Sequence, residues 1–417
     1  MHFMRRFRSL LPLVVAVLVI APGAATPTVQ AAAPAKVIAA SAPAQPPRWI
    51  QRIDAVVGDL PVSVVIGHQG STWYAHRDWV ARPPASNEKL LLSMALLDRF
   101  AAETTLPTRV LATSRPRDGV VNGDVWIIGH GDPEVDRADM VALADTLVAD
   151  GIHKVDGRVM GATGPFARDW FAPGWKSYFP KYYIALPTAL TFHANEDRRG
   201  RNIADPERRA ANELTKQLKR AGIKVTHEPG AGMPPAKLKG LATVRSDDLG
   251  SIVHRMDLWS RNFYAEVLGK LLGARAGGPP GTIAKGADAI ERFARSHGVG
   301  GLVTHDASGL SYRNRITPKG IVRLLWAADA APWGETLREL LAHGGQGTLK
   351  GRLNNVEVRA KTGTLTDISA LSGWVWLQRV GDWAEFSILS SGISKKRSVQ
   401  IENAIVRAVG ANGSPPP

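Results

Sequence analysis

Ser86 and Lys89 lie three positions apart in the stretch RPPASNEKLLLSMALLDRF, residues 82–100. On a helix this spacing places two side chains on one face, so the hydroxyl and the amine could touch. Three leucines follow at once, and apolar surroundings would lower the pKa of the lysine. A neutral amine beside a serine hydroxyl is a general base beside a nucleophile. The stretch alone also permits a plainer arrangement, in which Ser86 caps the helix and Lys89 extends to water.

Two later stretches carry residue types that would complete such a site. Ser260 and Asn262 begin an amphipathic helix in SRNFYAEVLGKLLG, and the sequence KTGT at residues 361–364 ends a strand. Across the whole chain S-x-x-K occurs only at Ser86, S-x-N only at Ser260 and K-T-G only at Lys361. One copy of each pattern, in this order, indicates a single site rather than three chance matches.

These three patterns are the signatures of penicillin-binding proteins and class A β-lactamases. From about Trp49 to Ile393 the chain resembles the class C low-molecular-mass penicillin-binding proteins, the D-alanyl-D-alanine carboxypeptidases/endopeptidases. The stretches NGDVWIIGHGDPEV, LPTALTFHANED, HDASGLSYRNRITP and GGQGTLKGRL are similar to characteristic parts of that family. The 174 positions between Ser86 and Ser260 also match the long insertion of the family. Arg261 stands where the family commonly has Asp, and DASGLSY replaces the more usual DGSGLSR.

Both the chemistry of the residues and the resemblance imply catalytic roles. Ser86, at the start of a helix, would attack a carbonyl carbon, and Lys89 would accept its proton. Lys361 would be a second cation that lowers the pKa of Lys89, holds Ser260 in a proton-relay bridge and attracts a substrate carboxylate. Asn262 would hydrogen-bond both the lysine and a substrate amide.

The remaining residues of the third pattern would bind the substrate. Thr362 and Thr364 would supply hydroxyl groups, with Gly363 between them. The N–H of Ser86 would hold the oxyanion, and the resemblance implies the N–H of Thr364 as the second donor. The DASG stretch at residues 306–309 is expected to shape a loop near the site rather than to do chemistry.

The resemblance implies a serine D-alanyl-D-alanine carboxypeptidase that hydrolyses peptidoglycan stem peptides through an acyl-enzyme, and also a DD-endopeptidase that cleaves cross-links. β-Lactam antibiotics would be covalent inhibitors, and no metal or organic cofactor is needed. A β-lactamase is the enzymatic alternative, which the long insertion and the lack of an evident deacylating glutamate motif disfavour. A catalytically inactive wall-binding scaffold is the other alternative, which the intact set of site residues disfavours.

Composition and the N-terminus indicate where the protein works. Residues 1–31 combine three arginines, a short apolar run and an A-x-A-like site, so a secretory signal peptide and an extracytoplasmic or periplasmic location are expected. Residues 32–47 are rich in Ala and Pro and predict a flexible leader. With no cysteine among 417 residues, disulfides and thiolate chemistry are excluded. The net charge of +15 favours peripheral association with anionic wall polymers or lipid head groups over nucleic acid, unless the arginines are merely scattered solubilising charge.

The elements that must position these residues follow from the apolar patterns. The sequence predicts a hairpin and three later strands, followed by a helix, at residues 61–77, 356–363, 368–378, 384–392 and 397–409. Strands at both ends of the chain indicate one α+β domain, and the resemblance implies a penicillin-binding/serine β-lactamase-like fold with an antiparallel sheet flanked by helices. This catalytic domain is expected to comprise residues 48–105 and 241–410, followed by a disordered tail at 411–417.

Residues 106–240 are predicted to form an inserted region of mixed strands and helices, with a helix over 206–222. The aromatic residues from Trp170 to Tyr183 are expected in the core of this insertion, and a surface that stacks on glycans is the alternative. The HGD motif at 130–132 resembles a metal pair. Since no third ligand follows at a suitable spacing, a turn is expected there.

Overall fold

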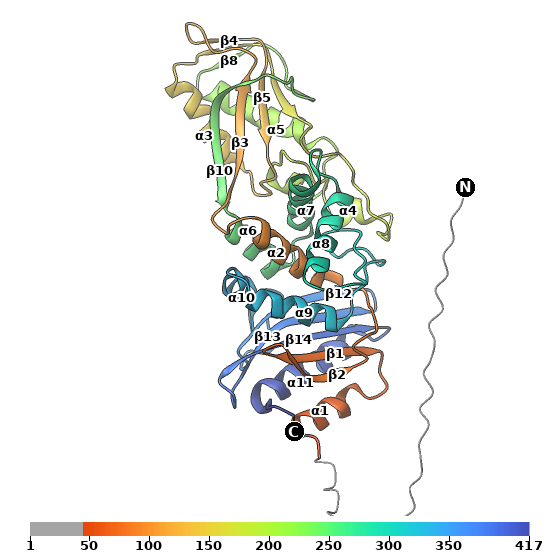
Figure 1. Ribbon diagram of the computed structural model, residues 1–417. Helices are drawn as coiled ribbons and strands as arrows, with labels where there is room; N and C mark the ends of the chain where they lie inside the picture. The colour runs from red at the N-terminus through yellow and green to blue at the C-terminus, as the bar shows by residue number, and fades with distance from the viewer. Residues whose placement is uncertain (1–44, 417) are drawn as a thin grey trace, which may run out of the picture. The chain divides into compact units, whose positions relative to one another are not determined.

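The computed structural model describes residues 45–416 (Figure 1). The predicted signal peptide, residues 1–31, lies outside the described residues, as does the predicted leader up to residue 44. From Pro46 onward the chain forms one compact unit. In this described part, none of the helices is both long and apolar enough to cross a membrane.

A six-stranded sheet in the order β11-β12-β13-β14-β1-β2 joins the two ends of the chain. Every pairing within it is antiparallel, as the resemblance implies. Its strands are β1 (Val62–His68), β2 (Ser71–His76), β11 (Ala342–His343), β12 (Val358–Leu365), β13 (Ile368–Leu377) and β14 (Asp382–Ser391). The predicted hairpin and the three later predicted strands are therefore confirmed.

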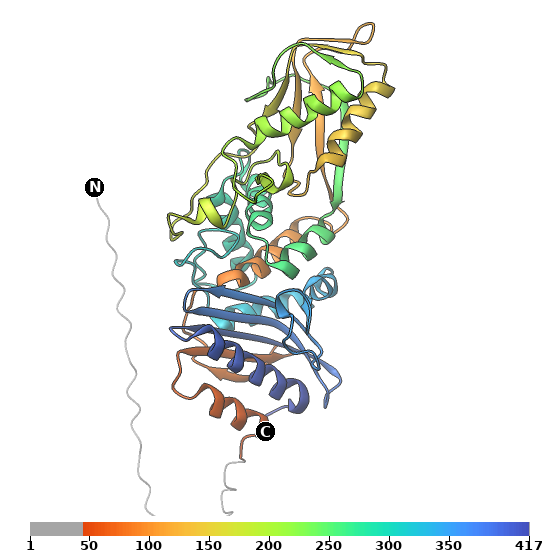
Figure 2. The ribbon, with the colours of Figure 1, turned by 180° about the vertical axis from the view of Figure 1, so that it is seen from behind.

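Helices cover both faces of this sheet. Figure 2 shows α1 (Arg48–Val57) and α11 (Lys395–Asn412) side by side on one face. On the other face α9 (Pro318–Asp329) packs against β1 and β14. A sheet covered on both sides buries consecutive residues of its strands, and in β13 nine of ten residues are buried. The indole of Trp49 donates a hydrogen bond to the carbonyl of Ser414 at 3.2 Å. Residues 411 and 412 belong to α11, so they are helical and not part of a disordered tail.

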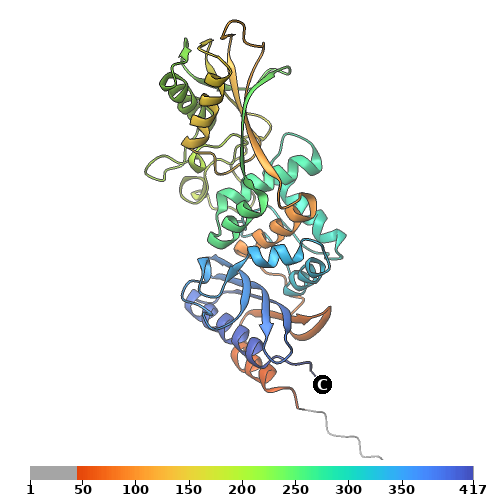
Figure 3. The same cartoon turned by 90° about the vertical axis from the view of Figure 1, so that its left-hand side faces the viewer.

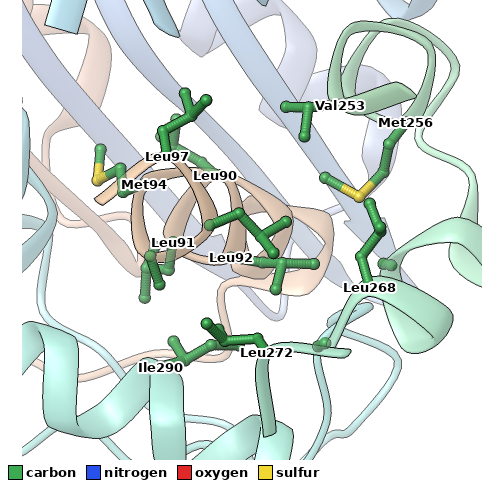
Figure 4. Packing of buried hydrophobic residues seen from close by; sticks show 14 of the residues in the cluster. Leu90, Leu91, Leu92, Met94, Leu97, Val253, Met256, Leu268, Leu272 and Ile290 are labelled. Carbon is green, nitrogen blue, oxygen red and sulfur yellow. The ribbon is translucent and has the colours of Figure 1, made fainter. Parts of the chain in front are cut away.

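A helical layer packs around α2, the helix that follows Ser86. Its members are α2 (Glu88–Arg99), α6 (Leu249–Trp259), α7 (Asn262–Gly277), α8 (Ile283–Ser296) and α10 (Gly334–Leu340). Figure 4 shows the three leucines at residues 90–92 of α2 among apolar side chains of α6, α7 and α8. Each fully buried leucine contributes about 1.5–3 kcal/mol to folding. Lys89, directly before these leucines, is completely buried.

The predicted inserted region contains two further sheets. One has the order β10-β3-β5-β7-β9, and the other has the parallel order β4-β6-β8. The strands are β3 (Thr105–Ala112), β4 (Val120–Asn122), β5 (Val125–Gly129), β6 (Lys154–Asp156), β7 (Val159–Ala162), β8 (Lys224–Val225), β9 (Gly230–Gly232) and β10 (Lys239–Asp248). The paired strands β3 and β10 carry the chain into and out of this region (Figure 3). The proposed boundaries at residues 106 and 240 fall inside these two strands, and the division into domains stays a prediction.

Two long helices pack on the larger of these sheets, and several short elements complete the fold. α3 (Arg137–Ala149) and α5 (Pro206–Arg220) share a core with the strands, so the predicted helix over 206–222 is confirmed. The short elements are α4 (Phe179–Tyr182), η1 (Ala85–Asn87), η2 (His193–Asn195) and η3 (Gly347–Leu349).

The aromatic segment from Trp170 to Tyr183 does not join the core of the insertion. Trp175 and Phe179 are buried in a separate small cluster with Ile283 and Leu310, which come from elsewhere in the chain. Four other aromatic residues of the segment are exposed: Phe171, Tyr178, Tyr182 and Tyr183. The prediction of an insertion core is therefore wrong for this segment. Its buried side chains pack against residues outside the insertion, Ile283 of α8 and Leu310, and its other four aromatic side chains named here lie at the surface. A glycan-stacking role stays a prediction.

Gly309 lies where its loop comes close to the backbone of the turn before Ser86. Its φ is +79°, and a Cβ atom there would lie 1.9 Å from the carbonyl oxygen of Ala85. Gly301 has a similar φ of +74° with nothing within 4 Å of its Cβ position. We expect Gly301→Ala to lower the free energy of unfolding by about 1–2 kcal/mol through backbone strain. Gly309→Ala should lower it by at least about 2 kcal/mol more, because the clash is with backbone atoms.

Denaturant unfolding of the two variants beside the unmodified protein gives both values. Equal losses would show that the close approach at Gly309 is not required for the fold.

Candidate active site

Ser86 lies in the turn η1, one residue after a strained position. Ala85 has a φ of +46°, in the left-handed region that costs a residue with a Cβ atom about 1–2 kcal/mol. The side chain of Asn87 anchors the turn to the sheet by donating to the hydroxyl of Ser372 at 2.7 Å. The turn therefore holds Ser86 at the junction of α2 and the sheet.

Lys89 contacts Ser86 as the spacing predicts, since its Nζ lies 3.1 Å from the Ser86 Oγ. The Nζ also donates to the Oδ1 of Asn262 at 2.8 Å and to the carbonyl of Ser308 at 2.5 Å. These acceptors come from three separate elements and occupy the three donors of an ammonium group. When the amine is neutral, it donates two of these bonds and can accept the third from the Ser86 hydroxyl.

The pKa of Lys89 is lowered to about 7, first by burial and second by the charge of Lys361. The sequence-based prediction of a lowered pKa is confirmed. Lys361 is also completely buried, and burial lowers its pKa to about 8, against the opposing effect of Asp257. At neutral pH, Lys89 is therefore the lysine with the larger neutral fraction, while Lys361 remains largely charged.

The predicted hydrogen bond between Lys361 and Ser260 is not formed in the structure. Ser260 ends α6 in a left-handed conformation with a φ of +56°. Within residues 45–416, no hydrogen bond joins its hydroxyl to either lysine, and the Lys361 Nζ donates to the carbonyl of Thr362 at 3.1 Å.

Asn262 does contact Lys89, the lysine of the first pattern. Its Nδ2 also donates to the carbonyl of Tyr183 at 3.4 Å. The aromatic segment thus borders the site.

Asp257 is a site residue that the sequence analysis missed. It is completely buried on α6, three residues before Ser260, and its Oδ2 accepts a hydrogen bond from the Ser93 hydroxyl at 2.6 Å. Burial raises the pKa of Asp257 to about 6, while the charges of Lys361 and Lys89 act in the opposite direction. Its carboxylate therefore supplies the negative charge that partly compensates two buried lysines. The available signal was a lone acid inside the apolar pattern LGSIVHRMDLW.

The loop that supplies the Ser308 carbonyl is held by buried carboxyl groups. Asp306 accepts hydrogen bonds from the N–H groups of Gly309 and Ser311 and from the Trp175 indole. Glu266 of α7 accepts from the N–H of Ser308 at 2.7 Å. Burial, followed by the charge of Asp306, raises the pKa of Glu266 above its ordinary range. The expectation that residues 306–309 shape a loop at the site is confirmed.

A third carboxyl group supports the same loop from α2. Glu88 is completely buried, accepts a hydrogen bond from the Thr304 hydroxyl at 3.1 Å and one from the Asn314 side chain at 3.2 Å. Burial and the charge of Asp306 raise its pKa well above the ordinary value. The residue directly before Lys89 therefore ties α2 to the loop whose carbonyl binds Lys89.

The strand β12 runs directly against the turn that carries Ser86. A Cβ atom at Gly363 would lie 2.7 Å from the carbonyl oxygen of Pro84 and 3.1 Å from the Ser86 nitrogen, so only glycine permits this approach. The side chain of Lys361, two residues earlier, lies on the same face of the strand. Thr362 and Thr364 therefore present their side chains to the opposite face.

The backbone groups of Thr362 and Thr364 point toward the edge of the sheet. The carbonyl of Glu357 accepts from the N–H of Trp376 in β13, and pairing continues in register to Leu365. Because antiparallel pairing has a period of two, odd-numbered residues of β12 bond to β13 and even-numbered residues face the other way. On that side, within the described residues, β11 pairs only with Arg359 and Ala360. No described strand therefore pairs with the edge beside Thr362 and Thr364, although the Thr362 carbonyl accepts from Lys361, and Thr364 is the exposed residue at which an extended peptide would add.

The HGD motif follows strand β5 and leads into a turn. Asp132 accepts from the N–H of Glu134 at 2.9 Å, which is a contact within a turn, as expected. His130 instead shares a hydrogen bond at 3.0 Å with the carbonyl of Pro107 in the neighbouring strand β3.

Comparison with known proteins places these features in a family context. The family model for D-Ala-D-Ala carboxypeptidase 3 (S13) matches residues 58–198 and 189–411. A D-alanyl-D-alanine carboxypeptidase of Actinomadura sp. (strain R39) is 28% identical over 85% of this chain and 82% of its own length. Carboxypeptidase Rv3627c of Mycobacterium tuberculosis is 28% identical over 81% and 77%, respectively.

Solved structures share the fold. Penicillin binding protein 4 from Haemophilus influenzae superposes with a TM-score of 0.77 at 18% identity, covering 86% of this chain and 99% of that chain. Bd3459, a predatory peptidoglycan endopeptidase from Bdellovibrio bacteriovorus, gives a TM-score of 0.53 at 16% identity, covering 85% and 93%. The expected α+β fold of the penicillin-binding type is confirmed.

The pKa values of the two lysines predict a bell-shaped pH profile for acylation of Ser86. Below a pH of about 7, Lys89 is protonated and cannot accept a proton, so the acylation rate should fall about tenfold per pH unit on the acid side. Above a pH of about 8, Lys361 loses the charge that helps attract a substrate carboxylate, so the rate should fall again. The second-order rate of covalent labelling by benzylpenicillin, measured from pH 5 to 10, gives the profile.

The acid limb of this pH profile, where Lys89 becomes protonated, should move when Asp257 is substituted. Its negative charge raises the pKa of Lys89, so Asp257→Asn should lower that pKa and shift the acid limb to lower pH. Asp248→Asn, which removes an exposed carboxylate from the other end of the same helix, is the control and should leave the limb in place. A shift to higher pH in Asp257→Asn would show that Lys89 is not the titrating base.

Proposed function

Since this chain belongs to the D-Ala-D-Ala carboxypeptidase 3 (S13) family, we propose that it hydrolyses the terminal D-alanyl-D-alanine bond of peptidoglycan stem peptides with Ser86 as its nucleophile. It is a serine D-Ala-D-Ala carboxypeptidase, and its relative from Actinomadura sp. is a D-alanyl-D-alanine carboxypeptidase. The observation that supports the assignment of Ser86 is its contact with Lys89, a buried amine whose pKa is about 7. A nucleophile beside a base that is half neutral at working pH is what acyl transfer requires.

Acylation is the first step. The Ser86 Oγ attacks the carbonyl carbon of the penultimate D-alanine, and its proton passes to the neutral Nζ of Lys89. The N–H groups of Ser86 and Thr364 hold the oxyanion, at the edge of β12 where the backbone of Thr364 points. The C–N bond then breaks, the leaving D-alanine takes the proton at its nitrogen, and the acyl group remains as an ester on Ser86.

Deacylation restores the enzyme. A water molecule attacks the ester carbon while a neutral Lys89 accepts one of its protons. The C–O bond to Ser86 breaks, and the serine oxygen takes that proton back. The same two steps cleave a cross-link when the leaving amine belongs to a neighbouring stem peptide, so we include DD-endopeptidase activity in the proposal.

β-Lactams are covalent inhibitors in this scheme because their ring amide presents the same carbonyl and a nearby carboxylate. Attack by Ser86 opens the ring, and the leaving nitrogen stays attached to the acyl group. We further propose that the enzyme acts outside the cytoplasm, in the periplasm or its equivalent, where its substrate lies. The predicted signal peptide supports that location. Once Arg5, Arg6 and Arg8 are removed with it, the net charge of +15 becomes +12, which supports peripheral contact with the anionic wall.

The direct test of the function is product analysis. The purified protein, incubated with a muropeptide mixture, should release D-alanine from pentapeptides, and mass spectrometry identifies the products. Ser86→Ala should abolish both this release and covalent labelling by fluorescent penicillin, with the fold retained. Persistent label in the variant would place the nucleophile elsewhere, and steady turnover of nitrocefin by the unmodified protein would favour a β-lactamase.

Substitution of each lysine by arginine separates the base from the fixed cation. Arginine keeps the charge but stays protonated, so it cannot accept a proton. Lys89→Arg should lower the acylation rate by about 10² to 10⁴-fold, the scale of general-base catalysis. Lys361→Arg should have a milder effect, because a fixed charge serves much of its role. The opposite ranking in two folded variants would make Lys361, acting through Ser260, the better candidate for the base.

A further inference from the structure

A lysine outside the three sequence patterns lies at the end of β12. Lys395 is the first residue of α11, and its Nζ donates to the Oγ1 of Thr364 at 2.6 Å and to the Oγ of Ser369 at 3.0 Å. Thr364 is exposed, and its backbone faces the open edge beside Ser86. The ammonium group of Lys395 is thus one hydrogen bond away from a residue of the K-T-G-T segment.

The charge of Lys395 has no carboxylate partner in the described part of the chain. The negative charge of Glu402 does act on Lys395, but one oxygen of Glu402 accepts from the Ser369 hydroxyl at 2.5 Å. The other oxygen of Glu402 pairs with Arg352 at 2.7 Å. Lys395 forms no ion pair within residues 45–416, and two hydroxyl oxygens occupy only two of its three donors. One N–H of a cation fixed by Thr364 and Ser369 therefore remains for an anionic ligand.

The position of Lys395 is not one that favours the helix. Lys395, Lys396 and Arg397 occupy the first turn of α11, which contains no acidic residue. The N-terminus of a helix carries partial positive charge, so cations there are unfavourable by a few tenths of a kcal/mol or more. The contact with Thr364 is therefore better explained by a role at β12 than by stabilisation of α11.

We propose that Lys395 is a specificity residue that binds, together with the Thr364 hydroxyl, the carboxylate of the leaving D-alanine. This inference rests on the proposed function, because it needs Ser86 as the nucleophile and the N–H of Thr364 as an oxyanion donor. The carboxylate is attached to the carbon next to the scissile nitrogen, so a substrate held at the Thr364 N–H brings it to the side chain of the same residue. Because the Thr364 hydroxyl accepts from Lys395, its own proton is available to donate to that carboxylate.

The ligand class is any acyl peptide whose leaving amine carries a carboxylate on the adjacent carbon. Such a group would receive one hydrogen bond from Thr364 and one charge-assisted bond from Lys395. Loss of a hydrogen bond to a charged group typically lowers affinity about ten- to a hundredfold.

A pair of substrates isolates this contact. The release of the last residue is measured for diacetyl-L-Lys-D-Ala-D-Ala and for the same peptide ending in D-alaninamide, with the full-length protein and the variants Lys395→Met and Lys395→Arg. Lys396→Met is the matched control, since Lys396 is exposed and forms no hydrogen bond or ion pair within residues 45–416. Circular dichroism and denaturant unfolding establish that each variant is folded.

We expect Lys395→Met to lower kcat/KM for the carboxylate substrate about ten- to a hundredfold and to leave the amide substrate unchanged, so that the preference for the carboxylate collapses. Lys395→Arg should retain most of the preference, and Lys396→Met all of it. An equal loss on both substrates would mean that Lys395 only supports β12, which overturns the inference but not the function. If the unmodified protein releases no D-alanine and is not labelled by penicillin, the proposed function fails and this inference fails with it.

Discussion

The site depends on the burial of one amine. Removing a lysine ammonium from water costs several kcal/mol, and here no carboxylate forms an ion pair with Lys89 among the described residues. Neutral oxygens of Ser86, Asn262 and Ser308 satisfy its donors instead. These acceptors compensate the charge only in part, so the pKa falls to about 7. The three elements that supply them must therefore be held closely enough to keep water out, which explains the apolar layer around α2 and the buried carboxyl groups beneath the 306–309 loop.

The charges nearest the nucleophile are close to balance before the reaction starts. At a pH a little above 7, Asp257 is ionised and Lys361 is mostly protonated, while about half of Lys89 is neutral and able to act as the base. When Lys89 accepts the proton of Ser86, these three residues together gain one positive charge. They do so at the moment when negative charge develops on the carbonyl oxygen of the substrate. Because these groups are completely buried and held by hydrogen bonds, this change needs little rearrangement of the protein. A carboxylate paired directly to Lys89 would keep the amine protonated and would remove this function.

The sequence could predict what depends on short spacing, and it failed where contacts join distant segments. The contact of Ser86 with Lys89 follows from the period of a helix, and the strands that end near Thr364 follow from apolar patterns. Asp257 lies in an ordinary helical pattern, and nothing local to it records that two lysines from distant segments lie nearby. Lys395 meets Thr364 only because α11 packs back across the sheet. The aromatic segment was misassigned for the same reason, since Trp175 and Phe179 pack against residues more than a hundred positions away.

The short strand β11 explains how a sheet can serve as a substrate site. An edge strand with free N–H and C=O groups is a hazard, because it invites pairing with other chains. In β12 this edge pairs with the two residues of β11 at Arg359 and Ala360, and no other strand pairs with it from Lys361 onward, within the part of the chain that the structure describes. A longer β11 would pair with Thr362 and Thr364 and close the site. A shorter one would expose more backbone without adding contacts near Ser86. The residue at which β11 stops pairing therefore decides which backbone groups of β12 can bind an extended peptide near Ser86.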